Sequence, residues 1–370
     1  MLRRSCISRR SGQIMAELTI APGGMQVVTP APRPLWRGLL DTDTDALADH
    51  SPEWIDAMCD DGRYVDASRL YELPDGRRFV LPLTRRRGMA GAGGWLACHP
   101  PAWGIGGLVG PGADAGVVTA VLADLRLTGA ARTWVRPNPV QGAYWAAAAR
   151  QPGTVVMPRR AHVIDLTGGP DAVLARMPAS TRRGLRVAAR RGVQVEMDRT
   201  GRLLPVHQQL VQASILRWAE HQHEPAALAR WRAARRDPPA KLEAIARHLG
   251  TALVVLVAYL DDRPVASNIT LLGAAAHDTR AAIDRPAAGP VRAAELLQWR
   301  AIQLACEHGC QTYHLGETGA SVSLARFKER FGAVGVDYAE YRLERVPYTR
   351  CDRALRTAAK RVLRFRDTPS

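Results

Sequence analysis

The chain has 370 residues, of which 51 are Lys or Arg and 35 are Asp or Glu, so its formal net charge is +16. With 46% hydrophobic and 23% charged residues, the composition is that of a globular protein and excludes a disordered chain. The longest apolar stretch, residues 252–260, is too short to cross a bilayer, which excludes an integral membrane protein. Six scattered cysteines form no disulfide framework and fit a reducing, cytoplasmic location.

The basic charge is unevenly distributed. Residues 1–150 carry 17 basic and 14 acidic side chains, whereas residues 151–370 carry 34 and 21, a net charge of +13. Only three of the 51 bases are lysines: Lys241, Lys328 and Lys360. A GC-rich genome explains most of the arginine bias, but the excess still attracts polyanions such as RNA, nucleotide phosphates or anionic lipid.

The first half predicts one domain behind a leader. Residues 1–34 are rich in Gly, Pro, Ser and Thr without periodicity, and we interpret them as a disordered basic leader. Ser51-Pro52-Glu53-Trp54 predicts the start of a helix capped by Ser51. We expect the first domain over residues 35–160, with its other elements at strand 64–72, turn 73–76, strand 78–84, helix 117–126 and strand 133–136.

The second half predicts a further domain over residues 161–348, followed by a basic C-terminal helix and tail over residues 349–370. Its mixed order of strands and helices is an α+β pattern with mixed sheets. In chain order the expected elements are strand 162–166, helix 178–191 ended by Gly192, strand 193–197, helices 203–222 and 239–249, strands 253–260 and 264–272, helix 291–307, strand 312–315, helix 324–331 and strand 336–343.

Several stretches resemble one family. Phe327-Lys328-Glu329-Arg330-Phe331-Gly332 resembles the F-K-x-x-F-G element of the FemABX aminoacyl transferases and the related GNAT-like acetyltransferase domains. The stretch from Thr181 to Val193 resembles their R-R-x-I-R-x-A-x-K-x-G-V helix. Ser51-Pro52-Glu53-Trp54 and the loop Trp103-Gly104-Ile105-Gly106-Gly107 resemble elements of the family's first half. The likeness covers residues 35–365, with its best elements in the second half.

This resemblance implies two tandem GNAT-like acyltransferase domains that face a shared cleft. Members of the family transfer an amino acid from aminoacyl-tRNA to an amine, typically on a peptidoglycan precursor, and relatives act on antibiotic intermediates or use other acyl donors. The implied partners are aminoacyl-tRNA and a small amine or UDP-linked peptide acceptor, with weak contact with an anionic membrane surface as a further option. No metal or cofactor is implied.

The resemblance also implies site residues. The attack of an amine on an ester or thioester produces an oxyanion, which one fixed donor or cation can stabilise by about 3–4 kcal/mol. Lys328 fits this catalytic role because a compact ammonium suits a buried oxyanion, although a solvated lysine is the alternative. The family often has Asp in a Y-D-F-G setting, whereas this chain has Tyr313-His314-Leu315-Gly316-Glu317, so we expect Glu317 to supply a catalytic carboxylate. Tyr313 and Phe327 are expected to bind substrate.

A basic helix is the second candidate site. Arg182, Arg186 and Arg190 stand at i, i+4 and i+8 and form one stripe, with Arg183 beside them. Such a stripe can contact successive phosphates, and we expect these four arginines to bind substrate. A solvated arginine-rich face is an equal alternative.

Other sequence signals are weaker. Residues 85–90 match the R-x-x-G-x-A pyrophosphate loop of coenzyme A-binding domains, but glycines follow instead of a helix. In the second half, the segment before the helix expected at residue 291 matches this pyrophosphate-loop pattern only at Gly289, and Pro290 lacks an N–H group. Both observations favour a tRNA-borne donor. The remaining alternatives are an acyl-CoA-dependent N-acetyltransferase and a non-catalytic RNA- or membrane-surface-binding protein.

Overall fold

The computed structural model describes residues 5–6, 16–88, 94–149, 153–319 and 321–362. The chain forms two compact units, which are residues 1–160 with 337–351, and residues 161–336 with 352–370. The segment 337–348, expected in the second domain, therefore belongs to the first unit. The reason is strand pairing, because Tyr341 and Arg342 lie opposite Val135 and Trp134 in an antiparallel pair. The order of the elements along the chain does not reveal that a late strand pairs with a strand of the first unit.

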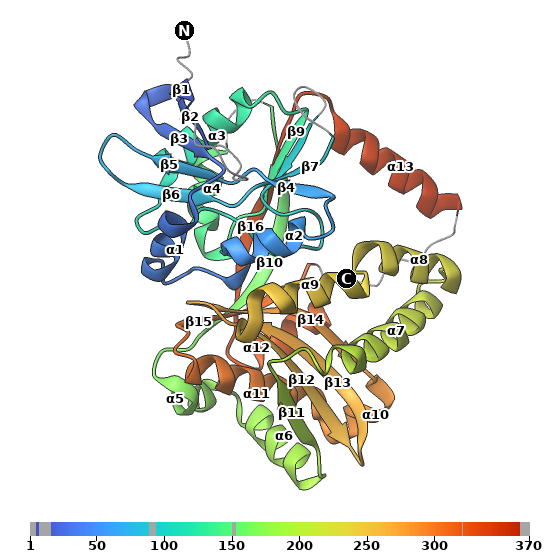
Figure 1. The fold of residues 1–370 in the computed structure, drawn as a ribbon. Coiled ribbons are helices and arrows are strands. Elements are labelled where there is room, and N and C mark those ends of the chain that lie inside the picture. Colours follow the sequence, from blue (N-terminus) through green and yellow to red (C-terminus); the bar gives the residue numbers. More distant parts are fainter. Residues whose placement is uncertain (1–4, 7–15, 89–93, 150–152, 320, 363–370) are drawn as a thin grey trace. The chain divides into compact units, whose positions relative to one another are not determined.

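The first unit contains two sheets (Figure 1). One has the strand order β1-β2-β3-β5-β6, and the other contains β16-β9-β8-β7-β4. Its strands are β1 (Ser5–Cys6), β2 (Glu17–Ile20), β3 (Gln26–Thr29), β4 (Tyr64–Asp66), β5 (Arg69–Glu72), β6 (Arg78–Leu81), β7 (Thr84–Arg86), β8 (Trp95–Ala97), β9 (Arg132–Val135) and the later part of β16 (Val334–Glu344). Its helices are α1 (Arg33–Thr42), α2 (Pro52–Cys59), α3 (Ala115–Leu127) and α4 (Gly142–Ala148).

The expected disordered leader is wrong from residue 17 onward. Strands β2 and β3 pair with each other, and β3 also pairs with β5. Met25 and Val27 are buried in the core of the first unit. The Gly- and Pro-containing segment between the strands is a turn of a hairpin, in which Gly23 has φ +83°.

The two first-half elements of the family resemblance contact each other. Helix α2 begins as expected, since Ser51 Oγ accepts a hydrogen bond from the Trp54 N–H at 3.2 Å. The Trp54 indole N–H donates to the Trp103 carbonyl at 2.9 Å and so holds the glycine-rich loop. Glycine is required at 104, because its φ is +96° and a Cβ would lie 2.0 Å from the Asp49 carboxylate.

The second unit is built on one sheet with the order β11-β12-β13-β14-β15-β10, in which β14 and β15 form a parallel pair. Helices α7 and α11 both pack against β12 and β13, and α5 and α6 pack on α11. The strands are β10 (Thr154–Asp165, which begins in the first unit), β11 (Gln194–Asp198), β12 (Leu253–Leu260), β13 (Arg263–Leu271), β14 (Ala276–Ile283) and β15 (Thr312–Glu317). The helices are α5 (Gly169–Arg176), α6 (Ala179–Arg190), α7 (Leu204–His221), α8 (Ala226–Arg236), α9 (Pro239–Leu249), α10 (Arg285–Val291), α11 (Ala293–Glu307) and α12 (Val322–Glu329), with α13 (Tyr348–Val362) running on from the first unit.

Two differences from expectation bear on the site. Strand β14 was not expected, because its sequence Ala-His-Asp-Thr-Arg-Ala-Ala-Ile has few β-branched residues. The helix expected over residues 291–307 is α11, but a short helix that was not expected, α10, precedes it, and Arg292 with φ +58° separates the two. None of the helices in the described part of the chain is both long and apolar enough to cross a membrane.

Candidate active site

Lys328 is a buried cation of the second unit. It lies in the last turn of α12, which begins where Ser321 Oγ accepts the Leu324 N–H at 3.3 Å. Phe327 and Phe331 lie edge to face with ring centroids 5.3 Å apart, and both pack on the core. This packing anchors the helix and leaves Lys328 only 5% exposed. The alternative of a solvated lysine is therefore wrong.

The Lys328 ammonium has an acceptor for each of its three protons. Nζ donates to the Gly316 carbonyl at 2.8 Å, to the Glu317 carbonyl at 3.0 Å and to Thr318 Oγ1 at 3.1 Å. Burial lowers the pKa of Lys328 to about 8, although the charges of Asp278 and Glu317 oppose this shift. The site thus holds a desolvated cation that is still mostly protonated at neutral pH.

A hydroxyl and an imidazole extend the contacts of Lys328. Thr318 Oγ1 lies 2.7 Å from Nδ1 of His162, which is fully buried on β10. Since an ammonium can only donate, the hydroxyl accepts from Lys328 and can donate its own proton to Nδ1. The other ring nitrogen then carries the proton, and it faces the Glu329 carboxylate at 3.6 Å. Sequence reasoning missed both Thr318 and His162, although His162 is the one titratable residue between apolar neighbours in that strand.

Asp278 is a buried carboxylate whose charge acts on Lys328. Its oxygens accept hydrogen bonds from the Asn268 amide at 2.8 Å, the Gln298 amide at 3.0 Å and the Thr270 hydroxyl at 3.1 Å. The Tyr313 hydroxyl also donates to it. Burial raises the pKa of Asp278, and these four donors act in the opposite direction. Asp278 was missed because it lies on the unexpected strand β14.

The structure revises two expected roles. Tyr313 is fully buried, and its hydroxyl contacts Asp278 and, at 3.0 Å, Thr270. It therefore positions Asp278 and presents no surface to a substrate. Glu317 contacts Lys328 through its backbone carbonyl, while its carboxylate acts on Lys328 through charge. The carboxylate that is hydrogen-bonded to Tyr313 comes from Asp278 on the neighbouring strand and not from Glu317.

Comparisons with known proteins concern the family and fold of this part of the chain. Residues 175–329, which include Lys328, Thr318 and Asp278, match the acetyltransferase (GNAT) domain family. Because of this match, we refer to residues 175–329 below as the GNAT domain. The structure of FemX is similar, with a TM-score of 0.62, 12% identity, and coverage of 85% of this chain and 96% of FemX.

Two further solved structures are similar. A conserved protein of unknown function from Bacteroides thetaiotaomicron has a TM-score of 0.51, 10% identity, and coverage of 84% of this chain and 97% of its own. A tandem GNAT protein from the clavulanic acid biosynthesis pathway has a TM-score of 0.45, 14% identity, and coverage of 86% and 98%. No curated protein matches the sequence. The expected α+β fold is confirmed, as is the FemABX-like resemblance at the level of fold. A GNAT-like domain is matched in the second half of the chain, and the comparisons support an acyltransferase.

The basic helix of the GNAT domain is α6, and its arginines differ in their environments. Arg182 donates to the carbonyls of Ala175 at 3.1 Å and Met177 at 3.0 Å, so it caps the C-terminal end of α5. Arg183, Arg186 and Arg190 are exposed. Arg182 therefore has a local structural role and is not part of the expected phosphate-binding stripe. The other three arginines face solvent and remain available to a polyanion.

The segment before α11 does not form a pyrophosphate loop. The Asp284 carboxylate accepts the Ala287 N–H at 3.4 Å and caps α10, so Gly289 lies inside a short helix. The Arg292 N–H, at the start of α11, donates to the Gly289 carbonyl at 3.2 Å. In the first unit the other candidate loop lies partly outside the described residues, and Arg85 and Arg86 belong to strand β7.

Proposed function

We propose that this protein is a cytoplasmic N-acyltransferase that transfers an amino acid from aminoacyl-tRNA to an amine. The acceptor would be a peptidoglycan precursor, such as a UDP-linked peptide, or the amine of an antibiotic intermediate. The observation that carries this proposal is the buried Lys328 ammonium in the GNAT domain, held by Gly316, Glu317 and Thr318. The likeness to FemX, which covers 85% of this chain, supports it at the level of fold.

Lys328 would stabilise the oxyanion that forms when the amine attacks the ester carbonyl. Its three protons are already bonded, so the oxyanion must replace one acceptor. The carbonyls of Gly316 and Glu317 are fixed by the backbone, whereas the Thr318 hydroxyl is on a side chain that has a second partner in His162. Exchange of Thr318 for the oxyanion leaves no polar group unpaired, because Thr318 keeps its bond to His162.

Two features favour a tRNA-borne donor. A coenzyme A site of the GNAT type needs free backbone N–H groups at the start of a helix, and here α10 precedes α11, with Pro290 lacking an N–H group and the Arg292 N–H engaged. The exposed Arg183, Arg186 and Arg190 on α6 offer positive charge to a polyanion. The family's description as an acetyltransferase domain favours acyl-CoA as the second candidate donor.

Replacement of Lys328 tests this proposal. Lys328→Met keeps the length of the side chain but removes the cation, and we expect turnover to fall about 100-fold to 1,000-fold. Arg326→Met on the exposed face of α12 is the matched control, because it removes the same charge without touching the site. Equal turnover of parent and Lys328→Met, in an assay that detects transfer by the parent, would remove Lys328 from the mechanism.

A further inference from the structure

Helix α8 forms a helical hairpin with α7 and carries an exposed tryptophan (Figure 1). The two helices pack on each other, and Ala229 of α8 is buried. Trp231 of the same helix is 59% exposed. The large indole ring of a folded domain is ordinarily mostly buried. The side of α8 that carries Trp231 therefore faces solvent instead of the core.

The exposed side of α8 is an apolar stripe. Ala227, Trp231 and Ala234 stand at i, i+4 and i+7, which places them on one face of the helix, and all three are exposed. Ala229 lies two positions before Trp231, about 200° around the helix axis, so the buried face is the opposite one. A surface helix normally has one apolar face, which packs on the core. Helix α8 has a second one, which we call the outer stripe.

Two arginines flank the outer stripe. Arg230 directly precedes Trp231, and the Arg235 guanidinium carbon lies 5.5 Å from the centroid of the Trp231 ring. Both arginines are exposed, and among the residues that the structure describes neither has a carboxylate partner. Helix α8 contains no acidic residue of its own. The outer stripe thus combines an indole ring with two positive charges that face solvent.

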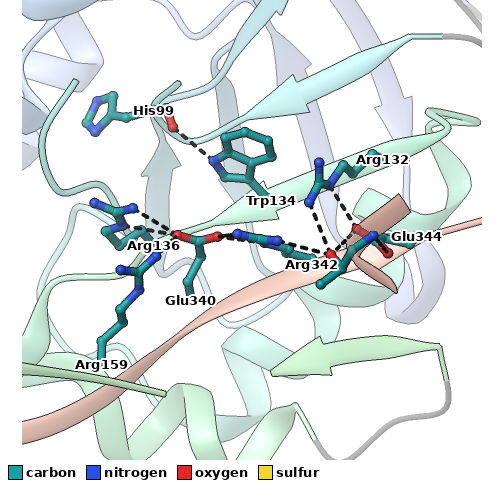
Figure 2. Close-up of polar contacts among 9 residues, drawn as sticks. His99, Arg132, Trp134, Arg136, Arg159, Glu340, Arg342 and Glu344 are labelled. Atoms are coloured by element: carbon teal, nitrogen blue, oxygen red, sulfur yellow. Dashed lines mark hydrogen bonds and ion pairs between the residues drawn. The ribbon is translucent and has the colours of Figure 1, made fainter. Parts of the chain in front are cut away.

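Other arginines of the chain differ in this respect. On the same helix, Arg232 pairs with the buried Glu224 at 2.9 Å. In the first unit, Arg136 and Arg159 bond to the Glu340 carboxylate at 2.9 and 3.1 Å (Figure 2). The abundance of arginine in the sequence therefore does not by itself leave charges without a carboxylate. The two arginines beside the outer stripe are available to an anion outside the chain.

The chemistry of the outer stripe favours a membrane surface over other partners. A second copy of the chain is disfavoured, because a two-fold contact through this face would bring the same arginines together. Single-stranded RNA binds in positively charged grooves lined by aromatic rings, whereas the face of a helix is convex. Tryptophan is enriched at the membrane–water interface, and arginines beside it attract anionic lipid headgroups. A helix can lie along such a surface with one face among the headgroups.

We propose that the outer stripe docks the protein on an anionic membrane surface, with Trp231 among the lipid headgroups and Arg230 and Arg235 on lipid phosphates. One indole ring and two cations give a weak, reversible and peripheral association. The net charge of +16 attracts the protein to the same surface from a distance. This inference goes beyond the proposed transfer reaction and does not depend on it.

Co-sedimentation with lipid vesicles tests the proposal. We expect the parent to bind vesicles made of equal amounts of phosphatidylglycerol and phosphatidylcholine, and to bind pure phosphatidylcholine much more weakly, since the arginines need anionic headgroups. Trp231→Ala should weaken binding to the anionic vesicles about tenfold or more. Arg230→Gln/Arg235→Gln should weaken it about tenfold to thirtyfold.

Two controls match these variants. Trp218→Ala removes a tryptophan of similar exposure, 51%, from α7. Trp218 follows Ser214 by one turn, and the Ser214 hydroxyl donates to the Ile283 carbonyl of β14 at 3.4 Å, so Trp218 lies on the side of α7 that faces the sheet. Arg300→Gln/Arg326→Gln removes the same charge from exposed positions on α11 and α12. Both control proteins should bind the anionic vesicles nearly as well as the parent.

A further variant leaves Trp231 in place. Ala234→Glu puts a negative charge into the outer stripe, and because the position is exposed and Glu is a good helix former, the helix should be retained. It should also weaken binding. Equal vesicle binding by the parent and Trp231→Ala, or equal weakening by the control variants, would overturn the proposal.

Two other results would reassign the outer stripe. One is binding of a single-stranded RNA oligonucleotide that depends on Trp231, without binding to vesicles. The other is a concentration-dependent dimer of the parent that Trp231→Ala abolishes, again without binding to vesicles. Either result would overturn the membrane proposal. The vesicle assay requires no aminoacyl-tRNA and no amine acceptor, so its failure is distinguishable from a failure of the proposed transfer reaction.

Discussion

Lys328 Nζ and Thr318 Oγ1 lie 3.1 Å apart, and this hydrogen bond joins the buried ammonium to the imidazole of His162. Lys328 comes from α12, Thr318 follows β15, and His162 lies on β10. Three segments therefore fix the position of one cation. The fixed carbonyls of Gly316 and Glu317 keep the ammonium in place when the oxyanion takes the position of the Thr318 hydroxyl, which is what a preorganised oxyanion site requires.

The pH dependence of transfer should report the titration of Lys328. Because burial lowers its pKa to about 8, the protonated form is lost as the pH rises through that value. We expect kcat/KM to fall above about pH 8 in the parent. In Lys328→Arg the cation persists at higher pH, so this alkaline limb should disappear from whatever activity remains. An unchanged limb in Lys328→Arg would assign it to another group.

The same pKa predicts a stability effect without any assay of activity. The folded-state pKa of about 8 lies below the ordinary value of 10.5, so between these two values the unfolded chain binds more protons at this position. The free energy of unfolding of the parent should therefore rise with pH in this window relative to that of Lys328→Met. Denaturant unfolding of both proteins at several pH values measures the difference, and parallel curves would contradict the assignment.

Thr318→Val should lower turnover because it removes the partner of His162 Nδ1 and the hydroxyl that positions Lys328 until the oxyanion forms. We expect a loss of about tenfold or more, with Lys328 left near its two carbonyl partners. Thr312→Val on β15 is the control, since its hydroxyl is buried without a hydrogen-bond partner in the structure. Turnover of Thr318→Val equal to that of the control would show that the hydroxyl has no part in transfer.

Tyr313→Phe separates positioning from substrate binding. Loss of the hydroxyl leaves Asp278 with three of its four side-chain donors, and we expect the free energy of unfolding to fall by about 1–2 kcal/mol. The KM for the acceptor should stay unchanged, because Tyr313 is fully buried. A raised KM for the acceptor with an unchanged free energy of unfolding would instead support the direct contact between Tyr313 and substrate that the sequence predicted.

The exposed arginines of α6 should contribute to binding of a polyanion in a salt-dependent way. The double variant Arg186→Gln/Arg190→Gln should reduce the slope of log K against log salt by about 1.8 for duplex and about 1.4 for single-stranded RNA. Arg182→Gln should instead lower stability, since it loses two bonds to backbone carbonyls. Identical titrations for the double variant and the parent would show that these arginines are solvent-exposed residues that do not contact the polyanion.

The sequence predicted elements that local signals define. The cap of Ser51 on α2, the turn at 73–76 and the helix that carries Lys328 were all expected, because each follows from a few adjacent residues. Lys328 itself was identified through the family resemblance. Its burial and its three acceptors depend on the chain segment 316–318, whose position relative to α12 no local pattern specifies.

The parts that were missed depend on long-range pairing. Strand β14 has weak strand propensity and is stabilised by pairing with β13 and β15, so Asp278 was not recognised. Strands β2 and β3 are short, and β5, the further partner of β3, follows about 40 residues later in the chain. The cluster around Glu340 joins residues separated by 181 and 204 positions, a separation at which sequence spacing carries no information.

The mass of an amine acceptor after incubation tests the central claim most directly. The purified protein is mixed with a total charged-tRNA preparation and candidate amines, with acetyl-CoA replacing the charged tRNA in a parallel reaction. We predict that mass spectrometry will detect an acceptor heavier by one amino-acid residue in the first reaction, and that Lys328→Met will form much less of it. Acetylation of an amine in the second reaction, with no product from charged tRNA, would contradict the account.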